Sequence, residues 1–332
     1  MKAHALKIGD TIGIFSPSYP GSNISLEATE LAIKFLENKG FNILRGSLTG
    51  QRDHYRSGSI KERADELNNL IENPEVKCIM AVAGGYVSNS ILPYINYQSL
   101  ITSPKIIVGF SDITAILLGI YAKTCLTTFY GPNLLTTFGQ VPPFSEMSYV
   151  YFYDLVSSGV SYPYIIPTPG IWTDDYVGLD EENVYCTTYK NKQITLNSGK
   201  ATGRLIGGNL NTLQGIFGSQ YMPQIEEGDI LFLEDKNLDA ETLERSFSML
   251  KISGVSDKIG GLIIGKHIDF KDRGTGLKHY DILLEVMGTP KIPILSEFDA
   301  SHAKPLITMP IGCNVELDAT NQKVTILDNC VF

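Results

Sequence analysis

The first 140 residues alternate between short apolar runs and helical patterns, and this alternation constrains the fold more than any other feature of the chain. Apolar runs at 11–17 and 41–46 flank a helical pattern at 25–39, which Gly40 ends. Two more apolar runs, CIMAVAGGY and KIIVGFSD, each lead into a turn and a helical segment. Such alternation predicts a parallel sheet with helices on both faces. We therefore expect an N-terminal α/β domain of the Rossmann or flavodoxin type.

The pattern changes after this region. From about 140 to 200, Pro, Tyr, Ser, Thr and Asp dominate without a clear period, which indicates an irregular linker that carries a substrate loop. Strand patterns then return with one clear helix, ETLERSFSMLKIS, so the second half is expected to form a smaller β-rich domain. The predicted division is an N-terminal domain at 1–145, a linker and loop at 146–200, and a C-terminal domain at 201–332.

Charge and hydropathy exclude several classes of function. The net charge is −9 and no Lys/Arg-rich run occurs, which argues against binding of a nucleic-acid polymer. The N-terminal MKAHALKIGDTIGIF is too polar for a signal peptide, and no run of about 18 apolar residues could cross a membrane. We expect a cytoplasmic protein with no membrane partner.

The five cysteines are scattered without metal-ligand spacing. They predict reduced thiols rather than a disulfide framework or a zinc site. Two of them, Cys78 and Cys125, lie in apolar stretches and are expected to be small core residues.

Ser111 is the candidate nucleophile. In KIIVGFSD, followed by ITAILLGIYAKT, it lies on a sharp turn from strand to helix, which would expose Oγ at the positive end of the helix. Ile113 stands where the second glycine of G-x-S-x-G would be, so the pattern departs from that of α/β-hydrolases. The alternative is that Ser111 only caps the helix, and local sequence by itself favours that interpretation.

Gly84 and Gly85 follow the preceding strand of the same βαβ unit, so their loop should lie at the same sheet edge as Ser111. A glycine loop there can present backbone N–H groups to an oxyanion, together with the amide of Asp112. The simpler interpretation of an isolated Gly-Gly is a tight turn.

A serine nucleophile needs a base and a buried carboxylate that orients it. His302 lies in the polar turn EFDASHAKP, but His267 follows a strand end and competes with it. The run GDILFLED ends in Glu234 and Asp235, which face opposite ways along a strand, so only one can serve. These residues by themselves leave both choices open.

One apparent phosphate-binding motif is rejected. The run GGLIIGK at 260–266 matches most of a P-loop, but His267 replaces the Ser or Thr that binds magnesium, and the middle of the run reads as a strand. There is also no HExxH, zinc-ligand pair or GxGxxG after a strand. We expect no metal or organic cofactor.

Seven motifs in order give the chain a family resemblance. They are IGIFSPS, AVAGGY, VGFSD, YGPN, GRLIGGNL, LFLED and a late histidine followed by P-I-G. With them, the chain resembles the serine LD-carboxypeptidase family, which includes muramoyl-tetrapeptide carboxypeptidases and microcin C self-immunity peptidases. The resemblance implies a homodimer. It also implies a Ser-His-Glu triad and a two-amide oxyanion hole, formed here by Ser111, His302, Glu234, Gly85 and Asp112.

The resemblance therefore selects Glu234 over Asp235 and His302 over His267. Around the histidine, this chain has Ser-His-Ala where the family often has Gly-His-Thr. The loop PGIWTDDYVGLDEEN is similar to that of the microcin-immunity branch, in which an aromatic residue stacks on the nucleobase of the substrate.

In that branch, Trp172 would be the stacking platform, and the alternative is that it anchors the loop. Asn209 in GGNL matches a substrate-contacting position, while Arg63 and Lys236 are further candidate partners for a carboxylate.

Three functions follow from these residues. The first is hydrolysis of the amide bond of aminoacyl- or peptidyl-nucleotides, as in microcin C resistance. The second is release of terminal D-alanine from murein tetrapeptides by LD-carboxypeptidase action. The third is a catalytically silent protein that binds a peptide or nucleotide. The expected partner is thus a small peptide or aminoacyl-nucleotide substrate.

Overall fold

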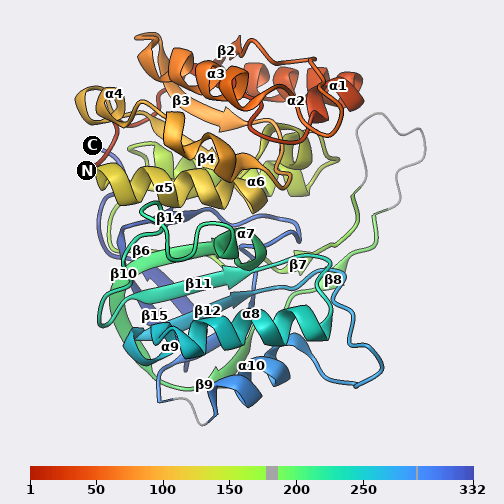
Figure 1. The fold of residues 1–332 in the computed structure, drawn as a ribbon, viewed down its shortest axis with the longest axis vertical. Helices are drawn as coiled ribbons and strands as arrows, with labels where there is room; N and C mark the ends of the chain where they lie inside the picture. The colour runs from red at the N-terminus through yellow and green to blue at the C-terminus, as the bar shows by residue number, and fades with distance from the viewer. Residues whose placement is uncertain (177–185, 289–290) are drawn as a thin grey trace.

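The computed structural model describes residues 1–176, 186–288 and 291–332, which form two lobes stacked one above the other (Figure 1). Each lobe is built around one large sheet. The two chain termini lie side by side where the lobes meet, joined by hydrogen bonds of Phe332 with Ala3 and Ala5 (Figure 1). Within the described residues, every helix is too short or too polar to cross a bilayer.

The sheet of the first lobe contains six strands in the order β14-β5-β4-β3-β1-β2. All neighbours are parallel except β14, which is antiparallel to β5, so the predicted parallel sheet is confirmed. The last strand comes from the far end of the chain, which only the tertiary structure reveals. The strands are β1 (Thr11–Phe15), β2 (Asn42–Arg45), β3 (Val76–Ala81), β4 (Ile106–Gly109), β5 (Thr128–Tyr130) and β14 (Met309–Ile311).

Helices cover this sheet, and one of them, α3, has a complete capping box at its N-terminus. In α3, Ser59 accepts from the Glu62 amide while Glu62 bonds back to the Ser59 amide, which satisfies two free backbone donors. The longer helices are α2 (Leu26–Asn38), α3 (Ile60–Glu72), α5 (Thr114–Thr124) and α6 (Phe144–Val156), and the shorter ones are α1 (Gly21–Ile24), η1 (Ser88–Tyr94), α4 (Tyr97–Thr102), η2 (Ser111–Ile113) and η3 (Leu134–Phe138).

Helix α6 lies where the sequence indicated irregular structure, so that prediction is wrong for 144–156. The helix buries Phe144, Ser148, Phe152 and Leu155, which are three or four residues apart. This is the spacing of a helix face. Tyrosines and serines share that face with the apolar residues, which hid the period in the sequence.

The sheet of the second lobe has eight strands in the order β6-β16-β15-β10-β11-β12-β13-β9, with a parallel centre from β10 to β13. The β-rich character predicted for this half is confirmed. The strands are β6 (Tyr164–Ile165), β9 (Ile194–Asn197), β10 (Lys200–Asn209), β11 (Ile230–Glu234), β12 (Gly261–Gly265), β13 (Ile294–Phe298), β15 (Asn314–Asp318) and β16 (Lys323–Ile326), and the helices are α7 (Leu210–Gln214), α8 (Ala240–Ile252), α9 (Val255–Lys258) and α10 (His279–Met287).

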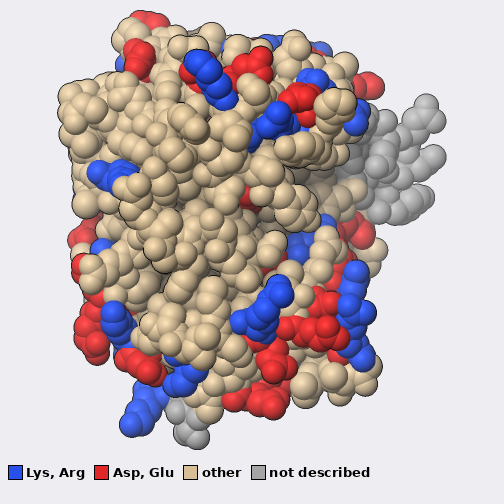
Figure 2. All heavy atoms as spheres, in the orientation of Figure 1, with Lys and Arg blue, Asp and Glu red and all other residues tan. Residues whose placement is uncertain are grey.

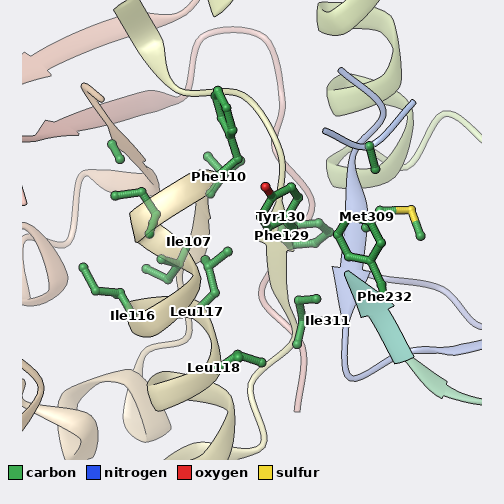
Figure 3. Close-up of a cluster of buried hydrophobic side chains, with 14 of the residues drawn as sticks. Ile107, Phe110, Ile116, Leu117, Leu118, Phe129, Tyr130, Phe232, Met309 and Ile311 are labelled. Carbon is green, nitrogen blue, oxygen red and sulfur yellow. The ribbon is translucent and has the colours of Figure 1, made fainter. Parts of the chain in front are cut away.

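The lobes meet through an apolar cluster that includes Phe129, Tyr130, Phe232 and Met309 (Figure 3). The rings of Tyr130 on β5 and Phe232 on β11 contact edge to face, with centroids 5.2 Å apart. A Cβ atom at Gly208 would lie 2.6 Å from Thr114 Oγ1, so glycine permits β10 to approach α5 this closely. This contact brings the end of β11 beside the turn that follows β4.

The cysteines agree only partly with expectation. All five have free thiols, and Cys78 is buried in the core as predicted. Cys125 is exposed, which corrects its assignment to the core, because it ends α5 in a left-handed conformation with φ of 56°.

Charged side chains are mixed on the face shown in Figure 2, where lysines and arginines are interspersed with aspartates and glutamates. This face of the described chain presents no continuous basic surface of the kind that a nucleic-acid polymer requires.

Candidate active site

Ser111 occupies a strained turn between β4 and α5. Its φ of 64° lies in the left-handed region, which non-glycine residues rarely adopt outside functional turns. The N-cap residues of η2 and α5 are Phe110 and Ile113, so Ser111 does not form the helix cap that local sequence favoured. Its hydroxyl is instead free to contact a residue from the other lobe.

That residue is His302, in the loop after β13. His302 Nε2 lies 3.0 Å from Ser111 Oγ, and His302 Nδ1 lies 2.7 Å from Glu234 Oε2. The ring of Phe110 packs edge to face against the imidazole at 5.1 Å. The structure thus brings together the three residues that the resemblance implied, from segments far apart in the chain.

Glu234 ends β11 and is completely buried. Burial would raise the pKa of its carboxyl, but the charge of His302 and hydrogen bonds from His302, Tyr130 and Asn209 outweigh it and lower that pKa. Its Oε1 accepts from the Tyr130 hydroxyl at 2.5 Å and from Asn209 Nδ2 at 2.9 Å. Since a carboxylate can only accept, Nδ1 of His302 must donate to it. In the neutral imidazole, Nε2 is then unprotonated and able to take a proton from Ser111.

The two rival residues lie outside this chain of hydrogen bonds. Asp235 accepts from the amides of Asn211 and Lys236, and burial together with the adjacent Glu234 raises its pKa to about 7. His267 is stacked on His279 with ring centroids 4.4 Å apart. Burial lowers the pKa of His267 to about 4.

The glycine loop lies directly against the nucleophile. A Cβ atom at Gly84 would lie 3.0 Å from Ser111 Cβ and 3.4 Å from the Asp112 amide. Gly85 has φ of +147°, and a Cβ atom there would lie 2.3 Å from Ser18 Oγ, so both positions favour glycine. Among the turn and loop hydrogen bonds of the described residues, none has the amide of Gly85 or Asp112 as its donor. Both amides remain available to an oxyanion beside Oγ.

Asp112 also ties the turn to this loop through its carboxylate and its carbonyl. The carboxylate accepts from the Ser88 amide at 3.0 Å, and the carbonyl accepts from the Ser88 hydroxyl. Burial raises the pKa of the Asp112 carboxyl. These bonds hold the nucleophile and the glycine loop in one relative position.

A cavity of about 580 Å³ opens in front of Ser111, within the size range of small-molecule sites. Both lobes line it, since Gly84, Gly85, Phe110 and Tyr86 come from the first. The second contributes Asn209, Asp235, Lys236 and His302, and Tyr176 adds an aromatic ring from the loop between the lobes.

Trp172, the predicted stacking platform, is not among the residues that line this cavity. It lies in β7 (Ile171–Trp172), which pairs with β8 (Tyr189–Lys190). Its ring packs on Tyr189 at 4.9 Å, with the Lys266 ammonium 5.3 Å from the ring centroid. These contacts are those of a loop anchor, and the stacking role of Trp172 stays a prediction. Residues 177–183 of the same predicted loop lie outside the described residues.

Tyr176 is the aromatic side chain of this loop that reaches the cavity, and sequence reasoning missed it. Two ammonium groups contact its ring, that of Lys304 at 3.6 Å and that of Lys236 at 4.0 Å from the centroid. Its hydroxyl donates to the carbonyl of His302 at 3.2 Å. One sequence feature could have identified Tyr176, namely its position in the same Asp-rich stretch as Trp172.

The remaining candidates have defined contacts. Asn209 lines the cavity, but its side chain bonds Glu234 and caps α7 through the Thr212 amide. Lys236 lines the cavity with its side chain partly exposed. Arg63 is buried and donates to carbonyls such as that of Pro17 at 2.7 Å, so it holds the backbone.

No group of three or more potential metal ligands is found in the part of the chain that the structure describes.

Lys304 gives the free energy of unfolding a testable dependence on pH. Its ammonium donates to Gln140 Oε1, and burial, with the charge of Lys236, lowers its pKa to about 7. An unfolded lysine has a pKa of about 10.4, so between these values the unfolded chain binds the extra proton and stability rises with pH. We expect Lys304→Met to remove about 1–3 kcal/mol of this rise between about pH 7 and 10.

The measurement is chemical denaturation of the wild type and of Lys304→Met at several pH values. Lys236→Met should remove a smaller part of the rise, because it takes away the neighbouring charge but leaves Lys304 buried. Parallel stability curves for wild type and Lys304→Met would contradict the prediction.

Comparison with known proteins gives matches over nearly the whole chain. The family models for the N-terminal and C-terminal domains of LD-carboxypeptidases match residues 12–131 and 202–317. The microcin C7 self-immunity protein MccF of Escherichia coli is 45% identical over 328 residues, covering 98% of this chain and 95% of that protein. A murein tetrapeptide carboxypeptidase of Pseudomonas aeruginosa is 25% identical, over 90% of this chain and 91% of its own.

A solved structure of MccF in complex with aspartyl sulfamoyl adenosine is 44% identical and superimposes with a TM-score of 0.97, covering 100% of both chains. The fold described above is therefore that of MccF.

Proposed function

Because this chain belongs to the LD-carboxypeptidase family of serine peptidases, we propose that it hydrolyses the amide bond of aminoacyl- or peptidyl-nucleotides through Ser111, His302 and Glu234. The observation that carries the substrate class is the aromatic ring of Tyr176 on the wall of the cavity that contains Ser111. Any of the nucleobases can stack on such a ring, because every base has an aromatic face. The structural relative that binds aspartyl sulfamoyl adenosine supports this class.

The reaction begins when His302 Nε2 takes the proton of Ser111 Oγ, which attacks the carbonyl carbon of the scissile amide. The oxyanion that forms accepts hydrogen bonds from the amides of Gly85 and Asp112. The protonated His302, held by Glu234, then gives its proton to the leaving nitrogen. Water, activated by the same histidine, hydrolyses the acyl-enzyme and restores Ser111.

A second candidate is cleavage of murein tetrapeptides, since the family also contains the Pseudomonas aeruginosa carboxypeptidase of that substrate. The two functions differ in what binds beside the scissile bond. A nucleoside needs an aromatic platform, whereas a muropeptide needs hydrogen-bond partners for its peptide and sugar. The aromatic ring beside Ser111 favours the first.

The test is a paired turnover assay with an aminoacyl sulfamoyl adenosine and a murein tetrapeptide, with products read by mass spectrometry. We expect cleavage of the adenosine compound. Tyr176→Leu should raise its KM about tenfold or more, since base–aromatic stacking contributes on the order of 1–3 kcal/mol. Tyr176→Phe keeps the ring and should keep the low KM.

Trp172→Leu is the matched control, because Trp172 belongs to the same loop but does not line the cavity. Release of D-alanine alone would assign the enzyme to murein tetrapeptides. Binding of either compound without turnover would contradict the proposed catalysis. An equal rise in KM for Trp172→Leu would place the base against Trp172, as the sequence first indicated.

The cellular setting is part of the same proposal. Five free thiols are in keeping with a reducing compartment, for which the cytoplasm is our expectation. The homodimer implied by the family resemblance stays a prediction, which sedimentation of the full chain measures.

A further inference from the structure

Tyr130 touches both the nucleophile turn and the carboxylate, and none of the roles assigned above includes it. It ends β5 in the first lobe, is completely buried, and its hydroxyl donates to Glu234 Oε1 at 2.5 Å. The hydroxyl oxygen of Tyr130 also accepts a hydrogen bond from the backbone amide of Ser111 at 3.3 Å. One hydroxyl thus connects the turn of one lobe to the acidic residue of the other.

The chemistry of its partners fixes the direction of these bonds. A carboxylate can only accept and a backbone amide can only donate, so the hydroxyl must donate to Glu234 and accept from Ser111. Burial and the negative charge of Glu234 hold the pKa of Tyr130 well above its ordinary value, so the proton stays on the tyrosine. A hydroxyl with both roles occupied has one favoured orientation.

The ring is held independently of the hydroxyl. It packs edge to face on Phe110, with centroids 6.3 Å apart, and on Phe232 at 5.2 Å. Figure 3 shows Tyr130 among apolar side chains that include Phe110 of the first lobe and Phe232 of the second. Phe110 in turn packs on the imidazole of His302. Removal of the oxygen by itself should therefore leave the packing intact.

We propose that Tyr130 is a positioning residue that sets the nucleophile turn and the Glu234 carboxylate in the geometry that the Ser111–His302–Glu234 reaction requires. This rests on the proposed function. By occupying Oε1 together with Asn209, Tyr130 leaves Oε2 to His302. By accepting from the Ser111 amide, it leaves the Asp112 amide as the donor for the oxyanion.

Loss of the hydroxyl has a definite electrostatic consequence. Without the Tyr130 donor, the negative charge of Glu234 is less compensated, so Glu234 stabilises the imidazolium form of His302 more strongly. In that form the histidine cannot act as a base. The acid limb of the rate should then move to higher pH. The other titratable groups around Glu234, which the substitution leaves in place, are His302, Asp235, His267 and Tyr176.

The experiment compares Tyr130→Phe with the wild-type full chain by two readouts. The first is kcat and KM on an aminoacyl sulfamoyl adenosine across pH. The second is the rate at which a fluorophosphonate labels Ser111, which requires no assumption about the substrate. We expect kcat and the labelling rate to fall on the order of 10- to 100-fold, with KM within about threefold and the acid limb at higher pH.

Asn209→Ser is the matched variant. It removes the other donor to Oε1 but can keep the cap of α7, and Asn209 has no contact with the Ser111 amide. It should shift the acid limb in the same direction with a smaller loss of labelling rate. Thermal unfolding of each variant shows whether the fold persists.

Wild-type kcat, labelling rate and pH profile in Tyr130→Phe would overturn the proposal. So would a loss of rate without a shift of the acid limb, because that pattern indicates a merely structural role. A wild-type protein that the probe does not label would instead overturn the catalytic triad itself, and Tyr130 with it. The two failures are thus distinguishable.

Discussion

Replacement of Ser111 by alanine is expected to lower kcat by about 10,000-fold or more, while substrate still binds. Without Oγ no acyl-enzyme can form, and only the oxyanion donors and the bound geometry remain to accelerate attack by water. The alanine keeps the Cβ atom, so the strained turn at φ of 64° is retained. Steady-state kinetics on the aminoacyl sulfamoyl adenosine measures kcat, and calorimetry measures binding.

The covalent readout makes this prediction specific. A fluorophosphonate should add to the wild type on the peptide that contains Ser111 and should leave Ser111→Ala unlabelled. Turnover by the alanine variant at more than a few per cent of the wild-type rate would remove Ser111 from the role of nucleophile, and another residue of the cavity would have to supply it.

Glu234→Gln is expected to lower kcat on the order of 1,000- to 10,000-fold with little change in KM. Three donors converge on this carboxylate, from His302, Tyr130 and Asn209. An amide in its place sets its own N–H₂ against one of them, so either His302 adopts the wrong tautomer or a buried donor loses its partner. Kinetics and thermal unfolding of the same preparation separate loss of catalysis from loss of the fold.

Asp235→Asn is the matched control for this substitution. Asp235 is the adjacent buried carboxylate, but it accepts from backbone amides and makes no bond to His302. Its replacement should change kcat by less than about tenfold. Similar losses for the two variants would show that charge in the cavity, rather than orientation of His302, is what matters.

The amino-acid pattern by itself predicted the parallel sheet of the first lobe and the turn at Ser111. Both depend on local features, since apolar runs of strand length, glycines and helical periods lie next to one another in the chain. It failed at α6, where Tyr and Ser lie among the apolar positions of the buried face. It also failed at Cys125, because an apolar stretch does not reveal that its last residue turns outward.

The choice among the site residues required either the family resemblance or the tertiary structure. His302 and His267 both follow strands of the second sheet, and Glu234 and Asp235 are neighbours. Only the packing of the lobes brings Glu234 and His302 to Ser111, while His267 stacks on His279. Strand alternation showed that one carboxylate would be excluded, but not which one.

The positions of Tyr176 and Tyr130 at the site are determined by tertiary structure alone. The loop of Trp172 contains two aromatic residues; Trp172 lies in the β7–β8 pair, whereas Tyr176 lines the cavity. Tyr130 meets Glu234 across 104 residues of sequence, because β5 and β11 come from different sheets. Local chemistry is determined by neighbours in the chain, whereas hydrogen bonds between lobes exist only after both lobes have folded and packed.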